Sequence, residues 1–468
     1  MDTIDKVFVG HDGGVSWGID NGICYVDSNN QYYCWSQISD DGTDGLYVTE
    51  FYGLAGVESD VDFLIGGTQD LSFFVYDNGN WRHSCGGDGG KSVIDYQDTD
   101  YSYVISSFNN YLYRLKNRGI THDISLLSPI NGYLWNPIVL NPVNPHTLFI
   151  GTDNLVKIEN AKSDSPDIES ISPNNLKDAV SAIGISKADT NTIYVSSTRI
   201  PWSADYSDSL MWRTTNGGNT WIPINFGDTI KRIFGYSFVT DIVVNPYDEN
   251  ELWICFGNVN WESLKIYHSA NAGTDWNVLN DGYPKNIPAH CIEYDEISKL
   301  LYVGTDVGVY YWDTDNPTSW IKLDDGLNKI ISEIVINNTY GKLRVATYGN
   351  GIWETDLPLC FELESDQTIS SDQTWSDTSV VCSDIIINGS TLTVTGSVYM
   401  NYPATITVKN YSTLKISGGF VKNAEIIVEN GGTLIIENNG KLILDTDDNV
   451  LVETGGVLNY TYGSIEIE

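Results

Sequence analysis

The chain has 468 residues, with 62 Asp and Glu against 25 Lys and Arg, which gives a formal net charge of −37 at pH 7. A chain this acidic is repelled by nucleic acid and by anionic lipid, so neither is expected as a partner. The chain is longer than a single domain with one hydrophobic core usually is, so more than one domain is expected. Its 43 Gly, 14 Trp and 29 Tyr are typical of a turn-rich all-β protein. The acidic surface either is simply solvated or offers carboxylates to a divalent cation such as Ca²⁺.

The chain begins MDTIDKVFVGHDGG, inside a repeat and without a secretory leader, and no apolar run of about twenty residues predicts a membrane span. There are seven cysteines. Cys24 and Cys34 flank an expected hairpin, and Cys360 and Cys382 flank an expected domain junction, so each pair is a candidate disulfide. No cysteine or histidine spacing suits zinc.

A unit of two apolar strands joined by a tight turn recurs through residues 1–358, as in KVFVGHDGGVSW, TLFIGTDNLVKI and LLYVGTDVGVYYWD. Most units follow a further apolar strand, and the period is roughly 40 to 55 residues. Eight such pairs predict a β-propeller of seven or eight blades. The first and last units are incomplete, which favours a ring closed by pairing of the two chain ends.

Two hairpins carry one phrase, WRTTNGGNTW (212–221) and YHSANAGTDW (267–276), and GHDGGVSW (10–17) is a looser copy. The phrase fits the hairpin between the third and fourth strands of a blade, where Asn or Asp bonds the turn backbone, Gly takes a positive φ, and Trp packs between blades. It resembles the Asp-box, or BNR repeat, of sialidases and related propellers, with Asn216 and Asn271 where that family has Asp. The resemblance implies a structural role on the face away from an active site.

A second resemblance spans about 350 residues. The stretches GGTQD (66–70), NWRHSCGGDGG (80–90), KIYHSANAGTDW, LYVGTDVGVYYWD and RVATYGNGIWETDL, in this order, resemble secreted propeller proteins of Bacteroidetes that the type IX system exports. The resemblance implies a secreted or cell-surface location, although the C-terminal sorting domain of those proteins is missing here.

Residues 359–383 are expected to form a junction between two domains, because the sequence pattern of the propeller units ends after Pro358. From 384 to 468, short alternating strands separated by Asn-Gly, Gly-Gly or Asn-Asn turns predict a parallel β-helix, or solenoid. An Ig-like sandwich is the alternative, although its strands are usually longer and its core more aromatic. The last coil has no obvious cap, so further sequence or an assembly partner is expected there.

In a propeller, the turns between second and third strands and the connections into each innermost strand lie on one face. That face is expected to carry several carboxylates that could act as acid and base on a glycosidic bond or bind a cation. The alternative is that these residues only make tight turns. The candidate catalytic residues are Asp12, Asp88 and Asp306, the further aspartates are Asp70 and Asp153, and the possible neighbours are His11, Gln69, Trp81 and His83.

Short stretches of the chain match two enzyme families that would use this face. Arg199-Ile200-Pro201 matches a sialidase phrase, but it lies mid-chain, and the chain is poor in the arginines that bind a sialic acid carboxylate. HDGGVSW is similar to the start of xyloglucanase-like hydrolases, which implies Asp12 as base and, by position, Asp306 or Asp88 as acid. No nucleophile motif or phosphate-binding loop is present.

Aromatic residues in irregular insertions favour a binding role, because flat rings stack on sugars while neighbouring Asp and Asn side chains form hydrogen bonds with them. They could equally cover loop backbone. The expected function is a secreted or surface propeller that binds glycans or surface proteins; the alternatives are a polysaccharide hydrolase and a structural part of a surface or virion assembly. The insertion aromatics are Trp135, Trp202, Trp261, Tyr206 and Tyr236, and the candidate ligand-binding set is Asp70, His83, Trp81, Trp202 and Trp261.

Overall fold

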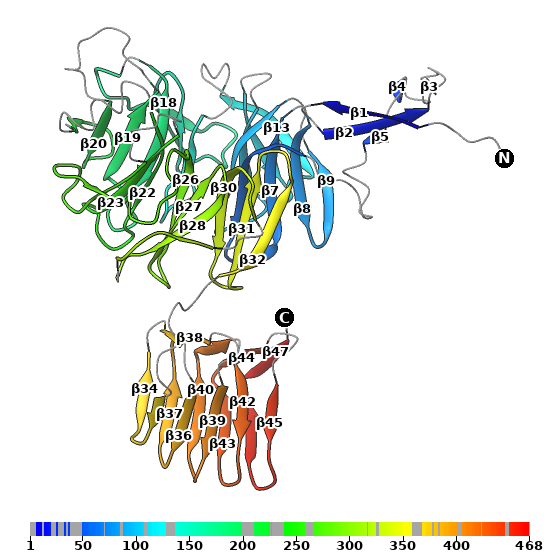
Figure 1. Cartoon of the computed structure of the whole chain (residues 1–468), viewed down its shortest axis with the longest axis vertical. Helices are drawn as coiled ribbons and strands as arrows, with labels where there is room; N and C mark the ends of the chain where they lie inside the picture. The colour runs from blue at the N-terminus through cyan, green and yellow to red at the C-terminus, as the bar shows by residue number, and fades with distance from the viewer. Residues whose placement is uncertain are drawn as a thin grey trace. The chain divides into compact units, whose positions relative to one another are not determined.

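The computed structural model describes residues 6–11, 14–19, 25–26, 32–33, 36–37, 49–69, 71–84, 88–106, 111–127, 136–176, 178–198, 210–224, 226, 238–257, 265–315, 317–323, 327–357, 367–376, 379–381, 384–400, 405–422, 424–444 and 449–467. Every regular element within these ranges is a β-strand (Figure 1). This part of the chain holds no helix with the length and apolar character that a membrane crossing requires. The chain divides into two compact units, Met1–Asp295 with Lys299–Asp356, and Glu296–Ser298 with Leu357–Glu468.

The first unit contains a seven-bladed β-propeller, so the predicted all-β propeller is confirmed and the blade number is seven. Each blade is an antiparallel sheet whose strands follow in chain order from the innermost to the outermost. Blades 1 to 4 are β6–β9 (Phe51–Val57, Asp60–Thr68, Ser72–Asp77, Asn80–His83), β10–β13 (Gly89–Ile94, Ser102–Ser106, Tyr111–Lys116, Thr121–Leu127), β14–β17 (Ile138–Leu140, Leu148–Gly151, Leu155–Glu159, Asp167–Ser170) and β18–β21 (Val180–Ile185, Ile193–Ser197, Met211–Thr214, Ile222–Pro223). Blades 5 to 7 are β22–β25 (Val239–Val244, Leu252–Phe256, Ile266–Ser269, Asn277–Val278), β26–β29 (Ala289–Asp295, Leu300–Thr305, Gly308–Asp313, Ile321–Lys322) and β30–β32 (Ile331–Asn337, Lys342–Thr347, Ile352–Asp356).

The second strand of a blade is its most buried element. All residues of β11, β19 and β23 are buried, because each of these strands has a paired neighbour on both sides and a further blade on both faces. Apolar clusters join consecutive blades; one combines Phe63, Ile65 and Val75 of blade 1 with Val104 and Leu115 of blade 2. Packing between blades is therefore the main source of apolar burial in this unit.

Blades 7 and 1 close the ring. Glu50, just before β6, forms an isolated antiparallel bridge with Tyr348. Asn337 Nδ2 donates to Val57 O at 2.9 Å, and Leu54 and Ala346 share one apolar cluster. The closure thus joins residues 50–57 to the seventh blade.

The repeated phrase lies where the sequence predicts it, between the third and fourth strands of blades 4 and 5. Asn216 Oδ1 accepts from Thr214 Oγ1 and from Thr220 N, both at 2.9 Å, and Gly217 and Gly218 have positive φ. In blade 5, Asp275 N donates to Asn271 Oδ1 at 2.8 Å. The closing tryptophans join neighbouring blades: Trp221 Nε1 donates to Ile171 O, and Trp276 stacks on Phe226.

The first predicted unit is not a blade. The strands β1 (Lys6–His11) and β2 (Gly14–Ile19) pair with each other, and β2 pairs with β5 (Ser36–Gln37) in a sheet of their own. A two-stranded sheet, β3 (Tyr25–Val26) with β4 (Tyr32–Tyr33), lies between them in the chain. The phrase at 10–17 therefore spans a hairpin outside the seven blades. The cysteine pairs predicted at 24 and 34 and at 360 and 382 lie outside the described residues.

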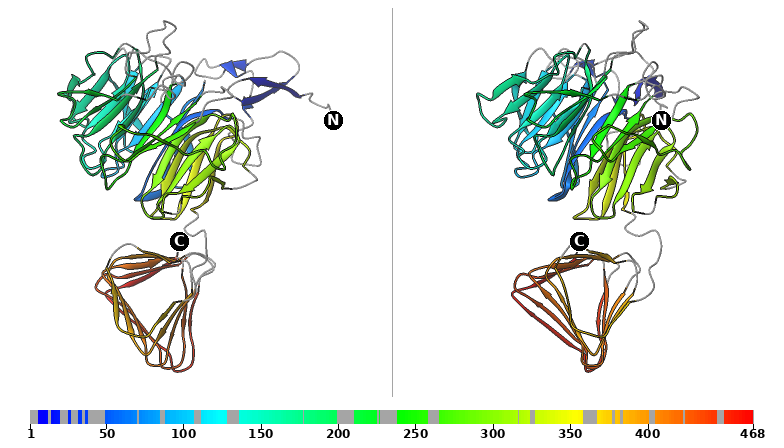
Figure 2. Two further views of the ribbon diagram at one scale, coloured as in Figure 1. Left: turned by 60° about the vertical axis from the view of Figure 1, so that its left-hand side comes forward. Right: turned by 90° about the vertical axis from the view of Figure 1, so that its left-hand side faces the viewer.

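The second unit is a parallel β-solenoid, as predicted, and its parallel pairing excludes the antiparallel Ig-like sandwich. Three five-stranded sheets form the sides of a triangular prism (Figure 2). From β33 to β45 the chain makes about four turns. The first sheet is β33 (Gln367–Ile369), β36 (Ile385–Asn388), β39 (Thr405–Lys409), β42 (Glu425–Val428) and β45 (Val450–Val452); the second is β34 (Gln373–Trp375), β37 (Thr391–Val394), β40 (Thr413–Ser417), β43 (Thr433–Glu437) and β46 (Val457–Thr461); the third is β35 (Ser379–Val381), β38 (Ser397–Met400), β41 (Phe420–Lys422), β44 (Lys441–Leu444) and β47 (Ser464–Ile467).

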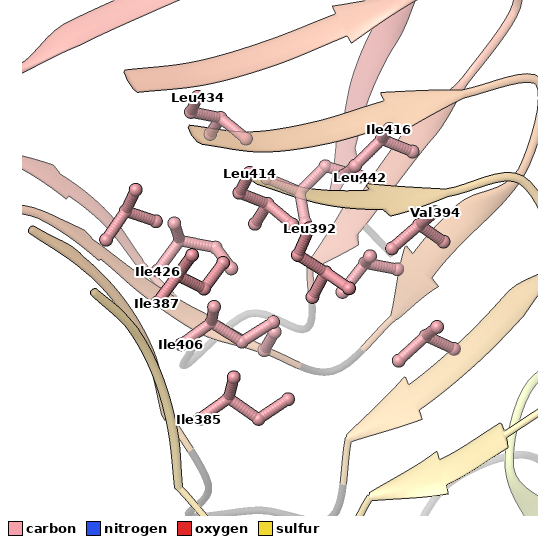
Figure 3. Packing of buried hydrophobic residues seen from close by; sticks show 14 of the residues in the cluster. Ile385, Ile387, Leu392, Val394, Ile406, Leu414, Ile416, Ile426, Leu434 and Leu442 are labelled. Carbon is pink, nitrogen blue, oxygen red and sulfur yellow. The ribbon is translucent and has the colours of Figure 1, made fainter. Parts of the chain in front are cut away.

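Side chains alternate strictly between the inside and the outside of the solenoid, and the inward ones fill its core. In β40 and β43 every second residue is buried, and Leu414, Ile416 and Leu434 lie inside (Figure 3). Like these three, Ile436 has no exposed surface. Equivalent residues stack in register, for example Leu414 beside Leu434. The first coil, β33 to β35, falls within residues 359–383, so the solenoid begins inside the stretch that was expected to be a junction.

Candidate ligand-binding site

One face of the propeller collects the first residues of the innermost strands. In blade 1, Phe51 at the start of β6 pairs with Thr68 at the end of β7, which in turn pairs with Ser72 at the start of β8. Blade 6 repeats this with Ala289, Thr305 and Gly308. We call this end of the blades face I, and the opposite end, which carries the phrase at 212–221, face II.

A β-bulge near the start of the innermost strand recurs at face I. The register shifts by one residue at Tyr52 in β6, Ser181 in β18, Thr240 in β22, His290 in β26 and Ser332 in β30. A bulge inserts one extra residue into the strand, so one side chain points in a different direction from the one that regular alternation would give it. All five re-aimed residues are polar or amphipathic. Neither Ser181 Oγ nor Ser332 Oγ, both shielded from solvent, has a hydrogen-bond partner in the described part of the chain.

Three side chains from blades 1 and 7 converge at face I. Tyr52 and Tyr348 both donate to Gln69 Oε1, Tyr348 at 3.3 Å. The two phenol oxygens lie 3.5 Å apart, and the ring centroids lie 5.6 Å apart. Burial raises the pKa of Tyr52, and Tyr348, Glu50 and Asp88 add to the shift, so this phenol stays protonated at neutral pH. We call Tyr52, Gln69 and Tyr348 the tyrosine–glutamine cluster.

Close backbone packing positions Gln69. A Cβ atom on Gly67 would lie 2.0 Å from Gly90 O, so only glycine lets blades 1 and 2 approach this closely beside the cluster. Gln69 follows at the end of β7, and its backbone N donates to Glu50 O at 3.1 Å. In the stretch GGTQD, Gly67 is therefore required by the packing of blades 1 and 2, and Gln69 is presented on face I.

Blade 6 adds an acid–imidazole pair to face I. His290 Nε2 and Asp306 Oδ1 lie 2.6 Å apart, and both side chains keep about a third of their surface exposed. The bulge re-aims His290, and the turn between β27 and β28 presents Asp306. The pair offers a carboxylate acceptor and an imidazole to a ligand.

Charged side chains lie inside the ring next to these bulges. Lys91 of β10 forms an ion pair with Glu333 of β30, and their side chains keep 24% and 19% exposure. Asp241 of β22 accepts from Ile292 N at 3.0 Å, which ties blade 5 to blade 6. Burial lowers the pKa of Lys91, but the Glu333 carboxylate outweighs this effect, so the pKa is raised and the ammonium stays charged.

Glu293 of β26 predicts a pH dependence of stability. Burial, followed by the charges of Asp241, Glu333 and Asp295, raises its pKa to about 8. Because the folded state then holds a proton that the unfolded state has lost, the contribution of Glu293 to stability is full below about pH 4 and is lost as the pH rises to about 8. The slope approaches 1.4 kcal/mol per pH unit, roughly, within that window. Urea unfolding at pH 5 and pH 8 should show a smaller loss of stability for Glu293→Gln than for the wild type; equal losses would contradict this assignment.

The predicted site residues divide between face I, the blade rim and undescribed segments. Asp306 and Gln69 lie on face I, Asp88 directly precedes β10 there, and Asp153 is exposed in the β15–β16 turn. Trp81 lies on the outermost strand, 44% exposed and packed on Tyr76. His83, at the end of that strand, donates from Nε2 to Leu71 O at 2.6 Å. The predicted residues outside the described ranges are Asp12, Asp70, Trp135, Arg199, Ile200, Pro201, Trp202, Tyr206, Tyr236 and Trp261; His11 is described only as part of β1.

Tyr52, Tyr348, His290 and Lys91 are absent from the sequence-based site. Aligning the blades on the Gly or Thr that ends the second strand would have placed Tyr348 beside Gln69 and Asp306, since all three follow that strand. Within the described residues, no three His, Cys, Asp or Glu side chains are grouped so as to hold a metal ion.

The fold and this face define a seven-bladed β-propeller with an appended β-solenoid. No protein-family model and no curated protein sequence matches the chain. Among solved structures, the chain is similar to an ancestral GH74 enzyme, at 12% identity over 66% of this chain and 45% of the other, with a TM-score of 0.51. This likeness shows the fold alone.

Two further similar structures have lower scores. The extracellular domain of a one-component system from B. thetaiotaomicron matches at 15% identity over 67% of this chain and 38% of the other, with a TM-score of 0.48. YCF48 bound to D1 peptide matches at 10% identity over 67% and 94%, with a TM-score of 0.47. The match spans less than half the length of the first two structures.

Proposed function

We propose that the protein is a binding module that captures a polyhydroxylated ligand, a glycan segment, on face I. The observation that carries the proposal is the convergence of Tyr52, Gln69 and Tyr348 from two blades into one hydrogen-bonded set. Tyr348 is 39% exposed and offers both a ring face and a hydroxyl, while Gln69 can accept and donate. Sugars need this combination of aromatic surface and directed polar groups.

The His290–Asp306 pair extends the proposed site toward blade 6. A carboxylate that accepts from two adjacent sugar hydroxyls suits a neutral glycan, whereas the acidic surface of the chain disfavours a polyanionic one. The proposal includes a secreted or cell-surface location, where such a glycan would be met.

The proposal predicts that Tyr348→Phe and Gln69→Leu weaken glycan binding. A glycan array with the purified chain identifies the ligand, and calorimetric titration of the best oligosaccharide then compares the variants. Each should lose about 1 kcal/mol or more, roughly five- to tenfold in Kd, because each removes a hydrogen-bonding group at the contact. Tyr247→Phe is the matched control, since Tyr247 is 70% exposed in the β22–β23 turn on face II.

Three outcomes would count against this function. Shortening of the bound oligosaccharide would favour a polysaccharide hydrolase over a binding module. An empty array together with capture of a protein partner by the wild type, but not by Tyr348→Phe, would replace the glycan by a protein ligand. Unchanged affinity in both variants would place the glycan elsewhere on the chain.

A further inference from the structure

Four consecutive blades carry a cationic or ionisable residue at the same position of the third strand. In each blade this residue lies directly opposite an aromatic residue of the second strand, so its side chain lies on the same side of the sheet as the ring. The pairs are Tyr103 with Arg114, Phe149 with Lys157, Tyr194 with Arg213, and Trp253 with His268.

In three of these blades the residue is paired with a carboxylate. Arg114 Nε donates to Asp123 Oδ2 at 2.8 Å, and Lys157 Nζ lies 2.5 Å from Glu159 Oε1. In blade 5, His268 Nε2 lies 2.7 Å from Glu251 Oε1. Each of these three blades thus combines an aromatic ring and a basic side chain at a repeated position with an acid that comes from a different place in each blade.

In the described part of blade 4, no carboxylate forms an ion pair with the equivalent residue, Arg213. Thr192 precedes β19 where Glu251 precedes β23, and its hydroxyl is engaged with Asp189. Among the described residues, Arg213 makes one hydrogen bond, from Nη2 to Asn250 Oδ1 at 2.9 Å, and its buried Nε has no hydrogen-bond partner there. Of the five arginines in the described ranges, it alone has no ion pair; the other four, all paired with carboxylates, are Arg82, Arg114, Arg118 and Arg344.

A cavity of about 660 Å³ lies beside this arginine, between blades 4 and 5. One wall is the outermost strand of blade 4, where Ile222 is 57% exposed, together with the buried Ile224 that follows this strand. The other wall is the turn at 270–274 of blade 5, with Asn250 and Asp248. The cavity therefore combines one unpaired guanidinium with an aliphatic wall.

We propose that Arg213 binds the carboxylate of a small organic acid in this cavity, and that this carboxylate takes the part of the protein carboxylates Asp123, Glu159 and Glu251, which reach the equivalent residue of blades 2, 3 and 5 from three different strand positions. A guanidinium matches a carboxylate with two parallel hydrogen bonds. One cation beside Asp248 suits a single negative charge better than a phosphate dianion. The aliphatic wall contributes by covering the apolar part of the ligand. This site is separate from the one on face I.

The test uses 4-methylpentanoate and its neutral isostere 4-methylpentanamide as probes, with binding followed by ligand-observed NMR. The wild type should bind the acid about tenfold or more tightly than the amide, because only the acid pairs with the guanidinium. Arg213→Gln, which can keep a hydrogen bond to Asn250, should lose this preference, and Arg213→Lys should keep part of it. Lys157→Met, at the equivalent position of blade 3, should bind like the wild type.

Circular dichroism and thermal unfolding verify that each variant is folded before binding is measured. A wild type that binds neither probe, or that binds both equally, would overturn the proposal. So would an Arg213→Gln variant that still prefers the acid, since the preference would then come from another cation. Neither result depends on glycan binding at face I, so the two proposals fail separately.

Discussion

Replacing Lys91 with methionine is expected to lower the free energy of unfolding of the propeller by about 2–4 kcal/mol. Lys91 is paired with Glu333 and shares the ring interior with Asp241 and Glu293. Removing the cation leaves carboxylates without their counter-charge, and breaking a buried pair on one side costs more than the pair itself contributes. The partial exposure of both side chains keeps the expected loss below that of a fully buried pair.

The double variant Lys91→Met with Glu333→Leu checks the cause. Urea unfolding should show that it recovers part of the loss, since no unpaired charge remains from the pair. Lys299→Met is the matched control, because its ion pair with Asp315 is half exposed and should contribute little. If Lys91→Met unfolded like the wild type, the ion pair between blades 2 and 7 would not stabilise the propeller.

Leu434→Ala is expected to destabilise the solenoid by about 2–5 kcal/mol. Leu434 has no exposed surface and stacks between Leu414 and Leu458 of the neighbouring coils. Truncation removes apolar contacts and leaves a cavity that the regular backbone cannot close. Because each coil contacts only its neighbours, the loss should weaken the coils on both sides.

Ile435→Ala is the control for this effect, since Ile435 points outward from the same strand. Hydrogen exchange should report faster opening of residues 413–437 in Leu434→Ala and little change in Ile435→Ala. Equal effects in the two variants would contradict the assignment of the inner face.

The solenoid was the more predictable unit because its pattern repeats without interruption. Thr391–Val394 and Thr413–Ser417 alternate strictly, and the structure buries every second residue. The first coil escaped prediction, because β33 to β35 have three residues each and are separated by Ser and Asp, which reads as a junction.

The propeller was predicted from its hairpins, but the hairpin at residues 6–19 was wrongly counted as one of the repeated units of the ring. KVFVGHDGGVSW has the same apolar run and turn as a blade, but its two strands pair outside the ring. Local pattern predicts a hairpin; whether that hairpin joins a blade depends on contacts with distant strands.

The site could be predicted only where a turn presents it. Asp306 and Gln69 stand in recognisable turns, so their face was inferred correctly from topology. Tyr52 and His290 were missed because a bulge shifts the in-and-out alternation by one residue, and an alternation pattern cannot show that shift. Lys91 and Glu333 pair over 242 positions of sequence, which no local rule detects.

The most direct test of glycan capture at face I is hydrogen–deuterium exchange of the purified chain with and without the oligosaccharide identified on the array. Glycan binding at face I should slow exchange in the segments that carry the tyrosine–glutamine cluster and Asp306, namely residues 50–53, 67–69, 305–308 and 347–351, with no change on face II. Protection confined to face II or to the solenoid, or no protection at a saturating concentration, would contradict it.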